Sequence, residues 1–590
     1  LKEADVGITV LINDKIPRFE CVLKHKLSDF QVFEVDEQGQ VVRLKNVPSQ
    51  ADLTQEMQQK QEESKMKKEI IETQSFDFDT ADAKALAEIL GEVTFAKLKT
   101  FPQEAAERSF LTGENQPAIV TPVLEDKALR TAIHKGVRAV FVGALDSKAT
   151  DDSRVKITAA PKRSKGSGRG RPGASAGTIR STWPESGDYC QFHVYKEGKD
   201  TMEVANMLSR VLQKPPKTFG YAGTKDRRGC TVQRFTAYRV ATARLANLNR
   251  TLKDIVLGDF SYTKNGLTLG DLSGNRFLLT LRSVTGASKD EIETALTRLR
   301  EVGFINYYGM QRFGTSSTGT HEVGAHVLKH EFEKAVRLIL SEHAGAQGET
   351  RAAKLHWIAT SNAVETLERM PSRCIAEVAM LRQMVKAKSL TDWNASFHAV
   401  PRNLRLMYMH AYQSYVWNFA ASQRIQQFGM QPVAGDLVLT EQSAEGEKTG
   451  ASGREVIRAK LLTEDDLANY TIYDVVLPCP GCDVLYPGHS IKEVYVEVMK
   501  QHGLDPFNMV TTVKESTLMG AYRKLLSKPI TLSWEVLQYE DEDQQIAATN
   551  LDELEGRTIT LPTDGSKTAV KLEFQLETAA YATMLLREVV

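Results

Sequence analysis

The chain has 590 residues, of which 42% are hydrophobic and 25% are charged, and this composition is typical of globular proteins with sizeable cores. Lys and Arg together number 75, as do Asp and Glu, so a nucleic-acid partner would need local clusters of basic residues. Six cysteines are too few for a disulfide framework, and we expect reduced thiols in an intracellular protein. No apolar run reaches about 18 residues, so we expect no membrane-spanning segment.

The first predicted element is a strand over residues 29–35, where Phe30 and Val32 begin an alternating pattern. Residues 51–73 are rich in Gln, Glu and Lys, which predicts either a solvated helix or a disordered stretch. Residues 79–158 mix helical and strand-like patterns and are expected to fold.

A basic, glycine-rich segment follows at residues 161–173, and its composition predicts a flexible linker. We prefer the interpretation as a solvated loop over that of an RNA-contacting or nuclear-targeting segment. The two interpretations are compatible with each other.

The region from 187 to 320 carries the densest signals. Strands are predicted over residues 189–196, 231–240 and 275–283. Helices are predicted after a capping box formed by Asp200 and Glu203, and over residues 290–302.

Residues 304–527 have mostly helical patterns, including a long helix over 404–428 that ends at Gly429. An aromatic stripe on one face of this helix consists of Tyr408, Tyr412, Tyr415 and Phe419. We interpret the stripe as core rather than as a platform for stacking bases, because core packing demands such spacing. Residues 530–590 return to strand-like patterns.

The strongest chemical signal is the segment 219–233, in which one carboxylate, Asp226, lies among the cationic residues Lys225, Arg227 and Arg228. Adjacent cations keep a carboxylate ionised and attract phosphates. An ionised carboxylate is a possible nucleophile or base. On spacing alone, a surface loop of ion pairs is the commoner interpretation, and the P-loop pattern is absent.

The same segment closely resembles the Asp-bearing motif of the TruD-type pseudouridine synthases. Further segments resemble motifs of that family in the same order: 23–34, 195–201, 274–277, 306–314 and 581–588. Residues 412–418 and 486–487 resemble in particular the eukaryotic stand-alone members that act on tRNA, mRNA and small nuclear RNA. Residues 49–182 have no counterpart in the compact bacterial form.

The resemblance implies a role for each candidate residue of the site. It implies that Asp226 is the catalytic carboxylate, that Phe277 stacks on the flipped base and that Asn275 orients the base or the Asp226 loop. Lys24 is the expected cation beside Asp226, with Arg587 as the second candidate. The residues expected to shape the cleft or hold the substrate RNA are Lys225, Arg227, Arg228, Asn306, Tyr308, Gln311, Arg312, Phe313 and Arg587.

The implied reaction breaks the N-glycosidic bond of uridine, turns the base and joins its C5 atom to the ribose. No atoms are lost, so no cofactor is expected, and one carboxylate suffices as nucleophile or base. The target uridine must leave its stack, at a cost of a few kcal/mol, which stacking on an aromatic side chain can offset.

Two other residue groups could hold a metal, but we expect no metal site. Cys479 and Cys482 form a CxxC pair without a second pair at zinc-site spacing. His326 and His330 are four residues apart, with His321 nearby, and exposed helical histidines are common.

The resemblance implies an α+β protein whose catalytic domain has a mixed sheet drawn from residues 1–48, 183–301 and 529–590. A mostly helical domain, 302–528, would be inserted into it, and 49–182 would be an added module with the basic linker. The expected partner is RNA (tRNA, pre-tRNA, small nuclear RNA and mRNA), without a guide RNA and without a membrane. The expected location is the nucleus, with the cytoplasm as a second one.

Three alternatives remain open at this point. The chain could bind RNA without catalysis, it could be another base-flipping enzyme such as a glycosylase, or it could be a helical scaffold with incidental motif resemblance. Analysis of the product, which would be an isomer, a free base or nothing, separates them.

Overall fold

The computed structural model describes residues 1–12, 16–48, 76–107, 117–141, 144–150, 152–159, 187–314, 319–342, 348–440, 458–509 and 517–590. The chain forms two compact units, one of residues Leu1–Val47 and Trp183–Val590 and the other of residues Pro48–Thr182. The predictions for residues 51–73 and 161–173 lie outside the described residues.

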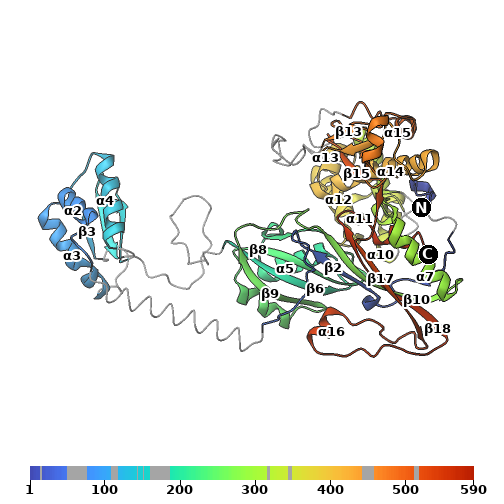
Figure 1. Ribbon diagram of the computed structural model, residues 1–590. Helices are drawn as coiled ribbons and strands as arrows, with labels where there is room; N and C mark the ends of the chain where they lie inside the picture. Colours follow the sequence, from blue (N-terminus) through green and yellow to red (C-terminus); the bar gives the residue numbers. More distant parts are fainter. Residues whose placement is uncertain are drawn as a thin grey trace. The chain divides into compact units, whose positions relative to one another are not determined.

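A mixed β-sheet forms the centre of the larger unit, and nine strands of the described residues join it. The main path runs through β17 (Thr531–Tyr539), β18 (Lys567–Glu577), β10 (Gly274–Thr285), β2 (Phe30–Val35), β8 (Cys230–Tyr238), β6 (Tyr189–Glu197) and β9 (Ile255–Thr263). Strand β1 (Glu20–Val22) pairs with β10, and β7 (Phe219–Tyr221) pairs with β8. Only the pairing of β2 with β8 is parallel among these described strands, so the predicted α+β class with a mixed sheet is confirmed (Figure 1).

The predicted strands correspond to β2, β6, β8 and β10, but β9 was not predicted. Its sequence lacks a clean alternation, because Gly258 and Asp259 interrupt it. Asp259 has a left-handed φ of 49°, and the pairing with β6 shifts register opposite this point. A local irregularity of this kind interrupts the alternation of apolar and polar residues by which a strand is predicted.

Two helices that lead toward the site have the predicted beginnings. Helix α5 (Thr201–Leu212) begins after Asp200, whose carboxylate accepts a 2.7 Å hydrogen bond from the Glu203 N–H. Helix α7 (Lys289–Val302) follows β10 and ends at Gly303, which has a φ of 76°.

The segment after α7 is largely helical, as predicted. Its helices are α8 (Thr320–Leu328), α9 (Phe332–Leu340), α10 (Gly348–Thr360), α11 (Ala363–Arg369), α12 (Ile375–Ala387), α13 (Trp393–His398), α14 (Arg402–Phe428) and α15 (Ile491–Gln501). Figure 1 shows α10 to α15 gathered in one layer, apart from the strands β6, β8 and β9. No helix of the described residues is long and apolar enough to span a membrane.

The long helix α14 lies at the centre of this helical layer. Tyr412 and Tyr415 are buried in the core, and Tyr408 and Phe419 pack against it. The aromatic stripe is therefore core, as predicted. A four-stranded sheet that was not predicted adjoins the helices and consists of β13 (Ala459–Leu461), β12 (Leu437–Leu439), β14 (Val475–Cys479) and β15 (Ala521–Lys524).

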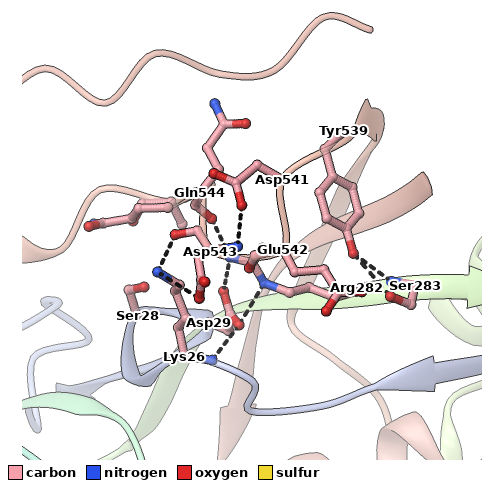
Figure 2. Close-up of polar contacts among 12 residues, drawn as sticks. Lys26, Ser28, Asp29, Arg282, Ser283, Tyr539, Asp541, Glu542, Asp543 and Gln544 are labelled. Carbon is pink, nitrogen blue, oxygen red and sulfur yellow. Dashed lines mark hydrogen bonds and ion pairs between the residues drawn. The ribbon is translucent and has the colours of Figure 1, made fainter. Parts of the chain in front are cut away.

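A buried ion pair fixes the segment that leads into β2. Asp29 accepts hydrogen bonds from the Arg282 guanidinium at 2.8 and 2.9 Å, and both side chains are nearly inaccessible to solvent. Figure 2 shows that Arg282 also donates to the main-chain carbonyls of Glu542 and Gln544, in the loop that follows β17. Residues from three distant parts of the chain are thereby joined at one point.

The smaller unit has its own core. Helices α2 (Ala81–Leu90), α3 (Glu92–Glu107) and α4 (Lys127–Val140) accompany an antiparallel sheet in the order β3 (Ala118–Val120), β5 (Val155–Ala159) and β4 (Leu145–Ala149). Leu86, Leu98, Ile133 and Ile157 are among its buried residues.

Candidate active site

A cavity of about 420 Å³ lies within the larger unit, where strands of the sheet meet the helical layer. Its lining includes Phe30 and Val32 from β2, Asn275 and Phe277 from β10, the loop residues 223–226, Gln311, Arg312 and Met407 from the helical part, and residues 578–583 near the C-terminus. Six segments that are distant in the sequence therefore form one pocket.

Asp226 lies in this pocket with 38% of its side chain exposed. Its Oδ2 atom accepts a hydrogen bond from Gln311 Nε2 at 2.9 Å and lies 3.3 Å from Lys24 Nζ. No described residue donates to the other oxygen, Oδ1. One oxygen of the carboxylate is thus fixed by two donors, and the other is available to a bound molecule.

Lys24 reaches Asp226 from an uncommon backbone conformation. Its φ is 60°, in the left-handed region that L residues with a side chain seldom adopt. Its ammonium lies 3.8 Å from the ring centroid of Phe30, and its side chain is 13% exposed. The ion pair and the aromatic ring together hold the cation at the edge of the pocket.

The loop that carries Asp226 is anchored to the sheet by a buried cluster of charges. Glu34 on β2 is fully buried, accepts a 2.7 Å hydrogen bond from Arg234 Nε and lies 3.7 Å from Lys225 Nζ. Burial lowers the pKa of Lys225, and the Glu34 carboxylate acts in the opposite direction. The charge pair explains why a buried lysine is tolerated in this loop.

Comparison with known proteins places this chain in a family. Residues 174–589 match the family model described as "tRNA pseudouridine synthase D (TruD)". The chain is 37% identical to "Pseudouridylate synthase 7 homolog" of Homo sapiens, over all of this chain and 81% of that protein. It is 35% identical to "Multisubstrate pseudouridine synthase 7" of Schizosaccharomyces pombe, over all of this chain and 90% of that protein.

The chain belongs to the TruD family. It is a pseudouridine synthase, an isomerase that converts uridine to pseudouridine in RNA. The resemblance stated from the sequence motifs is confirmed.

The basic residues of the TruD-family loop differ in how exposed their side chains are. The Lys225 ammonium is buried against Glu34, but the residue lines the pocket, so its predicted contact with RNA stays a prediction. Arg227 and Arg228 are exposed, and Arg227 donates only to the Gly198 carbonyl among the described residues. Their predicted contact with RNA stays a prediction.

Asn275 and Phe277 both line the pocket, because they are two residues apart on β10 and therefore on the same face of the sheet. The Phe277 ring is 7% exposed and stacks on Phe574 at a centroid distance of 5.1 Å. It is therefore both a core residue and a pocket residue. The Asn275 Oδ1 atom is buried and has no hydrogen-bond partner among the described residues. A buried carbonyl oxygen without a donor is unfavourable unless a ligand supplies one.

Three residues of the 306–314 motif were expected at the cleft, but their side chains make contacts in the interior of the protein. Phe313 is fully buried and packs edge-on against His321. Asn306 is buried and accepts a 2.8 Å hydrogen bond from Arg523. The Tyr308 hydroxyl points inward to Cys479 Sγ at 3.1 Å, and burial raises the pKa of Tyr308. These three side chains are not among the pocket-lining residues, and their predicted contact with RNA stays a prediction, whereas Gln311 and Arg312 do line the pocket.

Arg587 was the second candidate for the cation beside Asp226 and for an RNA contact. Its guanidinium instead donates to the Glu3 carboxylate at 2.6 Å and to the Val10 carbonyl at 2.7 Å. Arg587 is therefore not the cation beside Asp226, because its donors are directed to the N-terminal segment, and its predicted contact with RNA stays a prediction. Lys24 is the residue placed beside Asp226.

The residues considered as metal ligands have other contacts. Cys479 is buried beside Tyr308, and Cys482 contacts the sulfur of Met519 at 3.7 Å. His326 hydrogen bonds to Glu331 at 2.6 Å. Among the described residues, no group of three or more His, Cys, Asp or Glu side chains is arranged to hold a metal ion.

Three buried side chains that were not predicted as site residues form hydrogen bonds to the main chain of the Asp226 loop. Lys196, Thr201 and Gln233 are fully buried and make hydrogen bonds to this loop. The first two belong to the matched segment 195–201, but a sequence does not show that their side chains point to residue 226.

Proposed function

We propose that Asp226 is the carboxylate on which uridine isomerisation depends, and that the target uridine is flipped into the pocket beside it. The observation that carries this proposal is the asymmetric environment of the carboxylate. Lys24 and Gln311 hold Oδ2, no described residue donates to Oδ1, and Asp226 lines a cavity of about 420 Å³. A fixed anion beside the reacting sugar can act as nucleophile or as base, and both routes are compatible with this geometry.

The pocket also has chemistry that suits a uracil base. The unpaired Oδ1 of Asn275 can accept a hydrogen bond from the N3–H of uracil. The aromatic residues Phe277 and Phe30 offer apolar surface against which the flipped base can pack. These contacts would offset the cost of taking the uridine out of its stack.

For the RNA outside the pocket, we propose that Arg227, Arg228 and Arg312 contact phosphates. The first two are exposed at the loop, and the third lines the pocket from the helical side. Arginine is well suited to this task because its planar guanidinium binds two phosphate oxygens at once.

The proposed substrates are several classes of RNA: tRNA, pre-tRNA, small nuclear RNA and mRNA. The name "Multisubstrate pseudouridine synthase 7" of the Schizosaccharomyces pombe relative supports this range. We further propose that the protein recognises uridine without a guide RNA. The resemblance to eukaryotic stand-alone members supports this, and it also supports a nuclear location with the cytoplasm as a second one.

The proposed domain organisation assigns residues 1–48, 183–301 and 529–590 to the catalytic domain, with 302–528 inserted and 49–182 added. The strands of the large sheet support it, because they come from these three stretches.

The test is product analysis with purified protein and single RNA transcripts of each class, in the absence of other RNA. We expect pseudouridine in a tRNA transcript and in at least one mRNA fragment. Free uracil would indicate a glycosylase, and modification of tRNA alone would restrict the substrate range. A requirement for a second RNA would contradict guide-independent recognition.

A further inference from the structure

A fully buried lysine contacts the main chain of the candidate catalytic loop. Lys196, at the end of β6, has no accessible surface, and it donates to the main-chain carbonyls of Lys199 at 2.6 Å and of Asp226 at 3.2 Å. No carboxylate of the described residues forms an ion pair with it; Asp200, Glu203 and Asp226 act on it only from a distance. A buried ammonium without a carboxylate partner destabilises a fold, so the stability of the fold does not explain a lysine at this position.

A second buried side chain from the same turn binds the same loop. The Thr201 hydroxyl, at the first turn of α5, accepts a 2.8 Å hydrogen bond from the Lys225 N–H and donates to Gln233 Oε1 at 2.7 Å. Gln233 in turn donates to the Gly223 carbonyl at 2.9 Å. Main-chain groups of the loop are therefore held immediately before Asp226 and at Asp226 itself.

The main chain of the turn adds further bonds to the loop. The Gly198 N–H donates to the Gly229 carbonyl at 3.2 Å, and Arg227 Nε donates to the Gly198 carbonyl at 3.2 Å. The turn between β6 and α5 and the loop 223–229 are thus joined on both sides of Asp226.

We propose that Lys196 and Thr201 are positioning residues for the isomerisation, which set the direction of the Asp226 carboxylate through the main chain of its loop. The inference rests on the proposed catalytic role of Asp226. A hydrogen bond to the carbonyl of a residue restricts the rotation of that peptide unit and, with it, the direction of the side chain. A displacement of about 1 Å at a reacting group can slow a reaction about a hundredfold.

The first test compares two buried lysines. Lys354 is 3% exposed and donates to the Ile339 carbonyl at 2.8 Å, but it lies in the helical layer and pairs with Glu377. Lys→Met at either position removes a buried ammonium from a main-chain acceptor, so Lys354→Met is the matched control. The measurements are the single-turnover rate of pseudouridine formation at saturating tRNA transcript and the Kd for that transcript.

We expect Lys196→Met to react about ten to a hundred times more slowly, with its Kd within about twofold of the wild type. Lys354→Met should retain the wild-type rate within about twofold. A wild-type rate in Lys196→Met, or an equal loss of rate in Lys354→Met, would overturn the role of Lys196. Asp226→Asn is measured alongside: if it is as active as the wild type, the proposed function of Asp226 fails, whereas an inactive Asp226→Asn beside a fast Lys196→Met refutes the positioning role alone.

Thr201 is tested by a pair of substitutions. Thr201→Val removes the acceptor of the Lys225 N–H and should slow the reaction about tenfold, whereas Thr201→Ser keeps the hydroxyl and should restore the rate. Equal rates of the two variants, fast or slow, would contradict a role of the hydroxyl.

The unmodified protein offers a test that does not depend on the folding of Lys196→Met. Burial lowers the pKa of Lys196 to about 8, against the attraction of Asp200, Asp226 and Glu203 and with the repulsion of Lys225. Lys196 therefore loses its charge gradually as the pH rises through about 8, and the neutral amine is the weaker donor. We expect the single-turnover rate to fall as the pH rises through about 8, in the wild type and in Lys354→Met alike. A rate that stays constant through this range would contradict the proposal.

Discussion

At the scale of single residues, the central feature of the pocket is the way in which one carboxylate is held. Lys24 and Gln311 bind the same oxygen of Asp226, although they lie far apart in the sequence. The sequence motifs allowed Asp226, Lys24 and the pocket position of Gln311 to be predicted. The directions of neighbouring side chains could not be predicted: Lys225 and Phe313 belong to matched motifs, but both are buried.

Lys24→Met should slow turnover about a hundredfold at saturating RNA, because an oriented cation beside the carboxylate is lost. RNA affinity should change little, since only one positive charge is removed. Lys26→Met is the control: Lys26 lies two positions away, and its ammonium contacts the Asp543 carbonyl instead. A single-turnover assay in which the two variants are equally active would contradict the role of Lys24.

Phe277→Leu should slow turnover about tenfold, because the aromatic face offered to the flipped base is lost while most of the side-chain volume remains. Phe574→Leu makes a similar change in the ring that stacks on Phe277, and Phe574 is not among the pocket-lining residues. We expect both variants to lose about 1–2 kcal/mol of unfolding free energy, and only Phe277→Leu to lose most of its rate. A wild-type rate in Phe277→Leu would refute the stacking role.

At the scale of the elements, the buried pair of Asp29 and Arg282 joins β10 to the segment before β2 and to the loop after β17. Arg282→Met should lower the unfolding free energy by about 3–5 kcal/mol, because it leaves Asp29 charged and unpaired in the interior. Arg276→Met on the same strand breaks the half-exposed pair with Glu573 and should cost at most about 1 kcal/mol. Urea denaturation measures both, and equal costs would contradict the account.

The elements differ in how far they could be predicted. Strands β2, β6, β8 and β10 and helix α14 have strand-like or helical sequence patterns, and they occur where they were expected. The strands β12 to β15 have three to five residues each, which is too few for an alternating pattern to be recognised. Their pairing joins segments distant in the chain, so tertiary contacts rather than local preference determine them.

At the scale of the whole molecule, the candidate catalytic pocket exists only because distant segments meet. β2 pairs with β8 and β10, and the cavity is lined both by Phe30 near the start of the chain and by residues 578–583 near its end. The sequence predicted the order of strand-rich and helix-rich regions but not the order of strands in the sheet, because pairing over such distances leaves no local signal. The formal net charge of zero likewise gave no indication of an RNA substrate, which local charge around the loop has to attract.

The most direct test of the central claim is pseudouridine formation in a tRNA transcript by the wild type and by Asp226→Asn, with the Kd for the transcript measured for both. The asparagine keeps the size of the side chain and removes its charge. We predict that product formation falls by at least about a thousandfold while the Kd stays within about threefold, because binding depends mainly on backbone and shape contacts. Product formation by Asp226→Asn at the wild-type rate would contradict the claim that the reaction depends on this carboxylate.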